Sequence, residues 1–350
     1  MSRVRSLLVA SAVAFAVATA ASGCVRARYA VQAGFGQLDL WQRARPRAEV
    51  IADPDTDPAT RALLIEVDRV LAFARASGLA TRGNYDRYVP IAGEGVVWFV
   101  TACRPLAFEP KLWRFPLVGS FPYLGWFDQR DAIAFARRLE RAGWEVYVRP
   151  VAAYSTGGWL RDPVLSTMLD PGRGVRGLAN TLLHELVHAN VLVPDQSVFN
   201  ESVATFVADA MTADYLAQRF GAASDELAQY RRELADERRA GERLRRAVAD
   251  LDAVYRSDAP EAVKRRRKRR LLRALAADLG WGEPPNNAYL MQFRTYHAGF
   301  AALARLRRAC GAWPRVLEAL RAVTPRDFPA PQHEPIDAAV AASIGRCRAD

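Results

Sequence analysis

The sequence predicts a mainly helical α+β protein, and three observations indicate this fold class. Short β-branched and aromatic runs are confined to residues 91–165. Apolar residues recur at helical spacing before this segment and through most of the chain after it. The chain has 350 residues, of which 51% are hydrophobic and 25% charged, so it can bury a large core and is not disordered as a whole.

Residues 1–23 predict a signal peptide, which is not part of the fold. A short basic start precedes an apolar, uncharged stretch from Leu7 to about Ala21, which is short for a membrane-spanning helix of roughly 20 residues. Small residues then lead to Cys24, a pattern that resembles the bacterial lipobox. We expect a lipid anchor on Cys24 at the periplasmic face of the cell envelope, with the outer membrane favoured because residue 25 is Val. The alternative is an ordinary cleaved signal peptide followed by a chance cysteine.

The mature chain divides into three expected parts. Residues 24–90 form an N-terminal, mainly helical segment, with apolar residues at helical spacing between Arg61 and Arg75. Residues 91–165 form a small α+β unit, and residues 166–350 form a large helical region. In the last two parts the expected elements are strands at 95–101 and 144–151 and helices at 131–142, 177–192, 199–220, 225–255, 261–279 and 288–308.

Residues 184–188 read His-Glu-Leu-Val-His within an apolar stretch of helical character. On a helix, residues four apart share one face, so His184 and His188 can hold one metal ion. Glu185 then lies beside a water bound to zinc and can take its proton as general base. Histidines and a carboxylate in a buried helix also need partners, which a metal site supplies. The alternative is a helix with two ordinary histidines.

Glu201 is the expected third metal ligand. It opens the next expected helix after the turn at Pro194 and Asp195, and one turn with a returning helix can bring its carboxylate back to the metal. Two histidines and one glutamate leave a fourth position open for water, as catalytic zinc requires. The sequence therefore predicts a zinc site formed by His184, His188 and Glu201.

The pair of motifs His184-Glu-x-x-His188 and Asn200-Glu-x-x-Ala204 resembles the gluzincin zinc peptidases. More narrowly, the chain resembles a bacterial family of predicted aminopeptidases, which are exported proteins with a lipobox. The resemblance covers nearly all of the mature chain and includes the segments 123–128, 154–163 and 286–288. It implies a zincin-like catalytic region, a bound zinc ion and a peptide substrate. Aminopeptidase action in the strict sense is implied only by the family's name.

Two aromatic residues near the end of the second expected strand are candidates for substrate binding. In zincins an edge strand at this place binds the substrate backbone as an added strand, so Tyr154 and Trp159 are expected to line the cleft. The alternative is a structural turn in which Asp162 caps a helix.

Catalysis also requires a donor to the developing oxyanion, and Tyr296 is the leading candidate because related gluzincins use a tyrosine or histidine from a downstream helix. His297 and Tyr154 are alternatives, and Tyr296 could instead be a core aromatic residue. Asp209, two helical turns beyond Glu201, either bonds to a ligand histidine or is a surface carboxylate.

The formal net charge is +11, and much of the excess lies in the basic run 264–270. In an exported protein this run is expected to be a solvated helix face, with anionic lipid head groups as the alternative contact, and no nucleic-acid partner is expected. The charged helices around it predict a hairpin over residues 225–279. Cys310 and Cys347 both lie in the C-terminal helical region, and whether they pair stays open.

Together these features favour a zinc-dependent peptidase anchored by lipid in the bacterial envelope. Two alternatives from other classes remain. One is a non-catalytic metal-binding lipoprotein, against which the intact Glu185 argues, because a structural metal site has no use for a base. The other is a zinc amidase that acts on cell-wall peptides, which a panel of substrates would distinguish.

Overall fold

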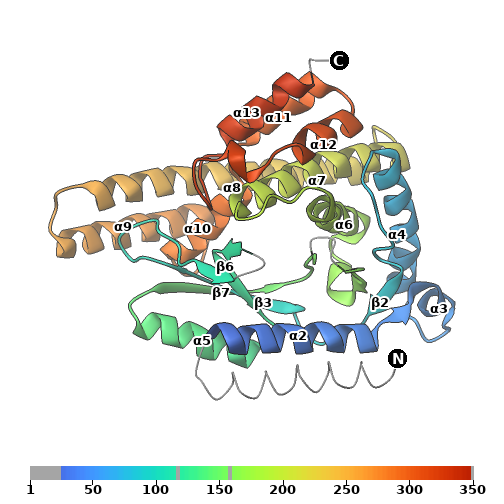
Figure 1. Cartoon of the computed structure of the whole chain (residues 1–350), viewed down its shortest axis with the longest axis horizontal. Helices are drawn as coiled ribbons and strands as arrows, with labels where there is room; N and C mark the ends of the chain where they lie inside the picture. Colours follow the sequence, from blue (N-terminus) through green and yellow to red (C-terminus); the bar gives the residue numbers. More distant parts are fainter. Residues whose placement is uncertain (1–24, 116–118, 157–159, 348–350) are drawn as a thin grey trace.

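The computed structural model describes residues 25–115, 119–156 and 160–347 (Figure 1). It shows a mainly helical α+β fold, as the sequence predicts. Two of the predicted site residues, Cys24 and Trp159, lie outside the described residues. Within the described ranges, no helix is long and apolar enough to cross a membrane.

The N-terminal part contains more than the helices that its pattern predicts. Its elements are α2 (Val25–Arg43), β1 (Arg45–Pro46), α3 (Arg47–Ala52), α4 (Pro58–Ala76) and β2 (Arg87–Val89). Strand β2 pairs antiparallel with β1 and parallel with β8 (Val164–Leu165), so a small sheet ties this part to the chain just before α6. Strands of two or three residues are too short to show alternation, which is why the sequence did not reveal them.

A second sheet has three antiparallel strands in the order β6-β3-β7. These are β6 (Tyr123–Trp126), β3 (Val97–Cys103) and β7 (Glu145–Val151), and the pair β4 (Trp113–Phe115) and β5 (Gly119–Phe121) lies beside them in sequence. In the central strand, Val100 pairs with Leu124 on one side and Val148 on the other. Helix α5 (Gln129–Arg141) covers one face of this sheet by burying Phe135 and Leu139.

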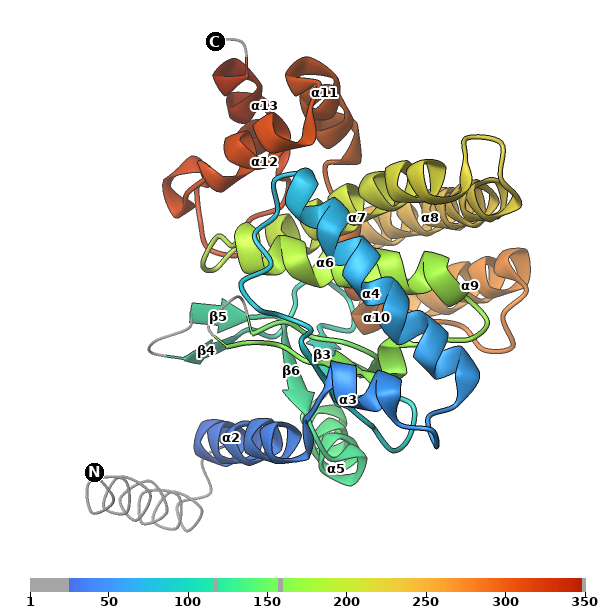
Figure 2. The same cartoon turned by 90° about the vertical axis from the view of Figure 1, so that its right-hand side faces the viewer.

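The rest of the chain is helical. Its helices are α6 (Gly174–Asn190), α7 (Ser197–Phe220), α8 (Asp225–Arg256), α9 (Glu261–Leu279), α10 (Asn287–Tyr296), α11 (Phe300–Cys310), α12 (Trp313–Arg321) and α13 (Asp337–Arg346), with short 3-10 helices at Ser166–Met168 and Pro325–Asp327. Helix α6 lies between α4 and α7, which both pack against it (Figure 2). Its residues Leu178, Leu182 and Leu186 are completely buried, and this burial fixes the helix that carries the metal-binding motif.

The prediction of a single helix over residues 288–308 is wrong, because the structure divides this segment into α10 and α11. Gly299 adopts the left-handed conformation with φ 63°, and a Cβ atom there would lie 2.4 Å from Cγ1 of Ile336, so the break depends on glycine. The Ser202 hydroxyl on α7 accepts from the Ala298 amide at 2.9 Å and donates to the Thr295 carbonyl at 3.0 Å. These bonds satisfy backbone groups that a continuous helix would have paired.

Helices α8 and α9 pair as a long hairpin, as predicted. The basic run in α9 is mostly exposed, but Lys268 is buried and 6% exposed. Its ammonium group forms an ion pair with Glu145 of β7 and donates to the Pro105 carbonyl at 2.7 Å. The predicted solvated face is therefore wrong for this one residue, which fixes the hairpin to the sheet.

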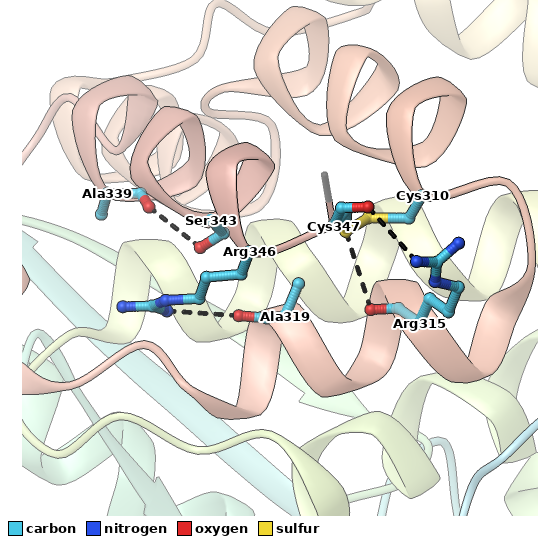
Figure 3. The surroundings of a disulfide bond; sticks show 7 residues. All are labelled: Cys310, Arg315, Ala319, Ala339, Ser343, Arg346 and Cys347. Atoms are coloured by element: carbon cyan, nitrogen blue, oxygen red, sulfur yellow. Dashed lines mark hydrogen bonds between the residues drawn. A yellow bond between two sulfur atoms is a disulfide. The ribbon is translucent and has the colours of Figure 1, made fainter. Parts of the chain in front are cut away.

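The C-terminal helices are joined by a disulfide bond between Cys310 and Cys347 (Figure 3). Arg315 of α12 lies against this bond, since its side chain donates to the Cys347 carbonyl at 3.4 Å. Cys103 is the free cysteine of the described chain, and it is buried. Cys310 and Cys347 therefore pair, and among the described residues the Cys103 thiol stays reduced and buried.

Candidate active site

The three predicted metal ligands come together at the contact between α6 and α7. The Nε2 atoms of His184 and His188 lie 3.1 Å apart on one face of α6. The Oε2 atom of Glu201, on α7, lies 3.5 Å from Nε2 of His184 and 3.3 Å from Nε2 of His188. The two imidazoles and the carboxylate therefore point at one place.

Asn200 explains how the chain returns so soon after the histidines. Its side-chain oxygen accepts from the Val193 amide at 2.8 Å, and its side-chain nitrogen donates to the Val193 carbonyl at 2.8 Å. This pair of bonds clamps the connection to the first turn of α7. The next residue is Glu201, and the small, fully buried Ala204 lies one turn further along the helix. Asn200 thus holds the turn.

The spacing of the ligand atoms fits zinc. Nitrogen and oxygen ligands lie about 2.0–2.1 Å from tetrahedral zinc, which puts two ligand atoms about 3.3 Å from each other. The three separations of 3.1, 3.5 and 3.3 Å surround that value. Two imidazoles and a carboxylate are also the donor set of many catalytic zinc sites. The residues present therefore fit a divalent metal ion of this kind.

The electrostatics of the three groups favour a cation between them. Burial alone would raise the pKa of the Glu201 carboxyl, but the imidazoles of His188 and His184 hold this pKa well below its usual range. Burial also disfavours charge on His188, yet the Glu201 carboxylate raises the pKa of that imidazole. A bound metal ion would take the place of the proton that this cluster attracts.

Tyr123 supports Glu201 from the sheet, and the sequence did not reveal this contact. Its hydroxyl donates to Oε1 of Glu201 at 3.0 Å, while Oε2 faces the histidines. The Tyr123 ring stacks on Phe99 with 4.4 Å between ring centroids, which fixes its direction. Tyr123 lies in the segment 123–128, one of those that carry the family resemblance. No spacing in the sequence, however, connects Tyr123 to Glu201.

A cavity of about 1040 Å³ lies over the ligands. Its wall comes from the sheet, from α6, α7 and α10, and from α2. Aromatic side chains from the strands and their connections form much of the wall, namely Phe99, Phe115, Phe121, Tyr123 and Phe127. Glu185 also lines the cavity although it is only 8% exposed, and burial raises the pKa of its carboxyl. The site thus combines metal ligands and a buried carboxylate in one large concave space.

Tyr296 and Arg149 form a polar pair in this cavity. The Tyr296 ring stacks beside the His184 ring with centroids 6.3 Å apart. Arg149 of β7 donates to the Tyr296 hydroxyl oxygen at 3.1 Å, so the hydroxyl proton is left to donate elsewhere. The alternative donor His297 points away, because its Nδ1 bonds to the Phe293 carbonyl oxygen at 2.9 Å within its own helix and it is not among the residues that line the cavity.

The segment after β7 contributes Tyr154 to the cavity wall and forms a turn held by Asp162. Tyr154 lines the cavity, and its hydroxyl bonds to the side chain of Gln37 on α2. Asp162 is buried and accepts from the hydroxyl of Thr156 at 3.0 Å and from its amide. The Asp162 carboxylate therefore holds a loop in shape, and it does not cap a helix.

Asp209 does not bond to a ligand histidine and is not a surface carboxylate. Its Oδ1 atom accepts from the Asn180 side chain at 3.1 Å, and the same Asn180 nitrogen lies 3.0 Å from the Tyr230 hydroxyl. Asn180 lies one helical turn before His184 and lines the cavity. Asp209 thus joins the helices behind the site, and burial raises its pKa to about 6.

The fold and the site define a mainly helical α+β protein with a His-His-Glu ligand set beside a large cavity. The sequence profile of the family described as "Putative aminopeptidase" matches residues 28–331. This match spans most of the chain, so the chain belongs to that family. No curated protein and no solved structure gives a significant match.

Proposed function

We propose that the protein is a zinc-dependent peptidase that hydrolyses peptide bonds in the cavity over His184, His188 and Glu201. One observation carries the proposal: three ligand atoms lie 3.1–3.5 Å apart, as tetrahedral zinc requires, beside a buried carboxylate in a space large enough for a peptide. Membership of a family described as an aminopeptidase supports a peptide substrate.

Glu185 is the proposed general base. A zinc ion held by the three ligands would lower the pKa of water and polarise a substrate carbonyl. Glu185 follows the first ligand directly in α6 and faces the same cavity. Because burial raises the pKa of its carboxyl, Glu185 accepts a proton more readily than an exposed glutamate does, and it can later return that proton to the leaving amine.

Tyr296 is the proposed donor to the oxyanion. Its hydroxyl oxygen already accepts from Arg149, so its own proton is available for the substrate oxygen. The arginine also makes the hydroxyl a better donor, because a hydrogen bond from a cation polarises it. Tyr154 is a proposed contact for the substrate backbone, and the same role for Trp159 rests on its place in the sequence.

A lipid anchor on Cys24 at the periplasmic face is the proposed location. It rests on the apolar stretch that ends in small residues before Cys24. Globomycin should block processing of the precursor, and a precursor processed equally with and without the inhibitor would contradict the anchor.

A peptide-library digest tests the peptidase proposal. The zinc-loaded protein and a Glu185→Gln variant would each be incubated with the library, and the products would be identified by mass spectrometry. We expect cleavage by the wild type alone, and the product termini will show whether the enzyme trims ends or cuts internally. Equal products from both proteins would contradict Glu185 as the general base. No products from either protein would contradict the proposal and favour a cell-wall amide as substrate or a structural metal site.

A further inference from the structure

The exposed apolar side chains of the protein are concentrated on two neighbouring helices. Of the six large hydrophobic residues that are exposed in the described chain, four lie on α2 and α5. They are Phe35 at 58%, Leu38 at 46%, Trp41 at 44% and Ile133 at 37% exposed. The remaining two, Ile65 and Leu192, are single residues on other elements, as is normal for a protein surface.

Helix α2 has two different faces. On the inner face, Leu40 is buried, and Gln32 bonds through its side chain to the Gly125 carbonyl and the Phe127 amide of the sheet region. On the outer face, Phe35, Leu38 and Trp41 follow one another at intervals of three residues, so they lie within an arc of about 120° on one side of the helix. The inner face fully explains how α2 packs, and the outer face has no partner in the described chain.

Helix α5 adds positive charge beside this apolar face. Arg130, Arg137, Arg138 and Arg141 are exposed, and within the described ranges none of them has an ion-pair partner. An ion pair between Arg28 of α2 and Asp131 of α5 joins the two helices. Both views show α2 and α5 side by side at the same end of the molecule (Figures 1 and 2).

We propose that this surface, formed by Phe35, Leu38, Trp41, Ile133 and the α5 arginines, binds an anionic lipid bilayer. Apolar and aromatic side chains enter the boundary between head groups and acyl chains, and arginines beside them pair with lipid phosphates. Tryptophan is favoured at that boundary because its ring is apolar while its N–H stays near water. The excess of unpaired arginines favours an anionic lipid over a neutral apolar partner.

The sequence before α2 leads to the same partner. The apolar stretch that ends near Ala21 and the proposed lipid anchor Cys24 immediately precede α2. Phe35 follows Val25 by ten positions, which is about 15 Å along a helix. An acyl chain on Cys24 would therefore hold the outer face of α2 close to the membrane. The inference does not depend on the peptidase chemistry.

This orientation has a consequence for the active site. The side of α2 that faces the protein lines the cavity through Tyr29, Ala33 and Gln37. The same helix thus borders both the proposed membrane contact and the substrate space. The proposed contact would therefore hold this wall of the cavity near the membrane surface.

Quenching of tryptophan fluorescence by brominated lipid tests the contact in the full chain. The protein would be bound to phosphatidylglycerol vesicles with dibrominated acyl chains, which quench only tryptophans that touch them. We expect quenching in the wild type and its loss in Trp41→Phe, a variant that keeps an apolar ring. Quenching of Trp41→Phe equal to that of the wild type would overturn the proposal.

Two matched pairs of variants test the rest of the surface. Phe35→Ser with Leu38→Ser should reduce the quenching of Trp41 at least threefold, whereas Ile65→Ser, which changes a 40% exposed apolar residue on α4, should not. Arg130→Ser with Arg137→Ser should reduce quenching on anionic vesicles, whereas Arg266→Ser with Arg270→Ser on α9 should not. A loss of quenching with the α9 pair but not with the α5 pair would overturn the assignment of this surface.

Discussion

The contacts of Tyr296 suit its proposed role as the donor to the oxyanion. Arg149 donates a hydrogen bond to the Tyr296 hydroxyl oxygen, and the His184 ring stacks beside the Tyr296 ring. The hydroxyl proton is therefore free to donate, and the position of the ring fixes its direction. Burial raises the pKa of Tyr296, which keeps the hydroxyl protonated across the working pH range.

Replacing Tyr296 by Phe should therefore lower kcat by about 10²–10³-fold, the usual loss of one oxyanion donor, with little change in KM. Steady-state kinetics on a cleaved peptide would measure this effect. The matched control is Tyr289→Phe on the same helix, where the ring packs on Trp281 and Tyr147. Full turnover by Tyr296→Phe would remove this residue from the mechanism.

We expect Tyr123 to act through Glu201, one of the proposed metal ligands. Its hydroxyl holds Oε1 of Glu201, so Tyr123→Phe should weaken zinc binding by about 10–100-fold, as loss of an outer hydrogen bond to a ligand does. Competition with a chelating dye would measure the affinity. Tyr29→Phe, which alters another tyrosine of the same cavity, should bind zinc like the wild type, and equal affinities for all three proteins would contradict this role.

Spacing in the sequence predicts only the groups that lie close together along the chain, whereas Tyr296 and Tyr154 were predicted from the resemblance to zinc peptidases. His184, Glu185 and His188 share one helix turn, and a single tight turn returns Glu201, so local rules are enough. Tyr123 and Arg149 reach the site from two strands of a sheet, at separations of 78 and 147 residues from their partners. Such contacts depend on how the sheet packs on the helices, which no local pattern contains.

At the scale of elements, the contact between α6 and α7 includes a carboxyl that titrates in an unusual range. Burial raises the pKa of Asp209 to about 6 from 3.8, so the folded state binds its proton more tightly than the unfolded state does. The charged carboxylate therefore lowers the free energy of unfolding. This loss grows as the pH rises from about 4 to about 6, and it is constant above pH 6.

Asp209→Asn removes this cost and keeps an oxygen that can accept from Asn180. We expect the variant to have a free energy of unfolding about 3 kcal/mol higher than the wild type at pH 7.5, with the advantage shrinking toward pH 4. Urea unfolding at both pH values would measure it. A variant less stable than the wild type at pH 7.5 would show that the charged carboxylate is needed.

The elements themselves were predictable in proportion to their length. The long helices α8 and α9 show many repeats of the helical period, whereas β1, β2 and β8 have two or three residues each and show none. The break between α10 and α11 was missed because the surrounding residues favour a helix. The close approach of Ile336 leaves room only for glycine at position 299, and this contact between distant residues is not visible in the local sequence pattern.

At the scale of the whole molecule, the disulfide closes the C-terminal helices into one unit. Its cysteines are 37 residues apart. A bond that closes a loop of this length lowers the entropy of the unfolded chain and so raises the free energy of unfolding by about 4 kcal/mol. Reducing agent should therefore lower the urea midpoint of the wild type. It should leave the midpoint of Cys310→Ser with Cys347→Ser unchanged, because buried Cys103 forms no disulfide in the described chain. Equal wild-type midpoints with and without reductant would contradict a stabilising bond.

The proposed peptidase requires one metal ion held between α6 and α7. Zinc content per chain, measured by mass spectrometry of purified protein, tests this most directly. We expect one zinc ion per chain in the wild type, in Glu185→Gln and in His333→Ala, which changes a histidine outside the cavity. His184→Ala should lose most of its zinc. One zinc ion per chain in His184→Ala would contradict the assigned site.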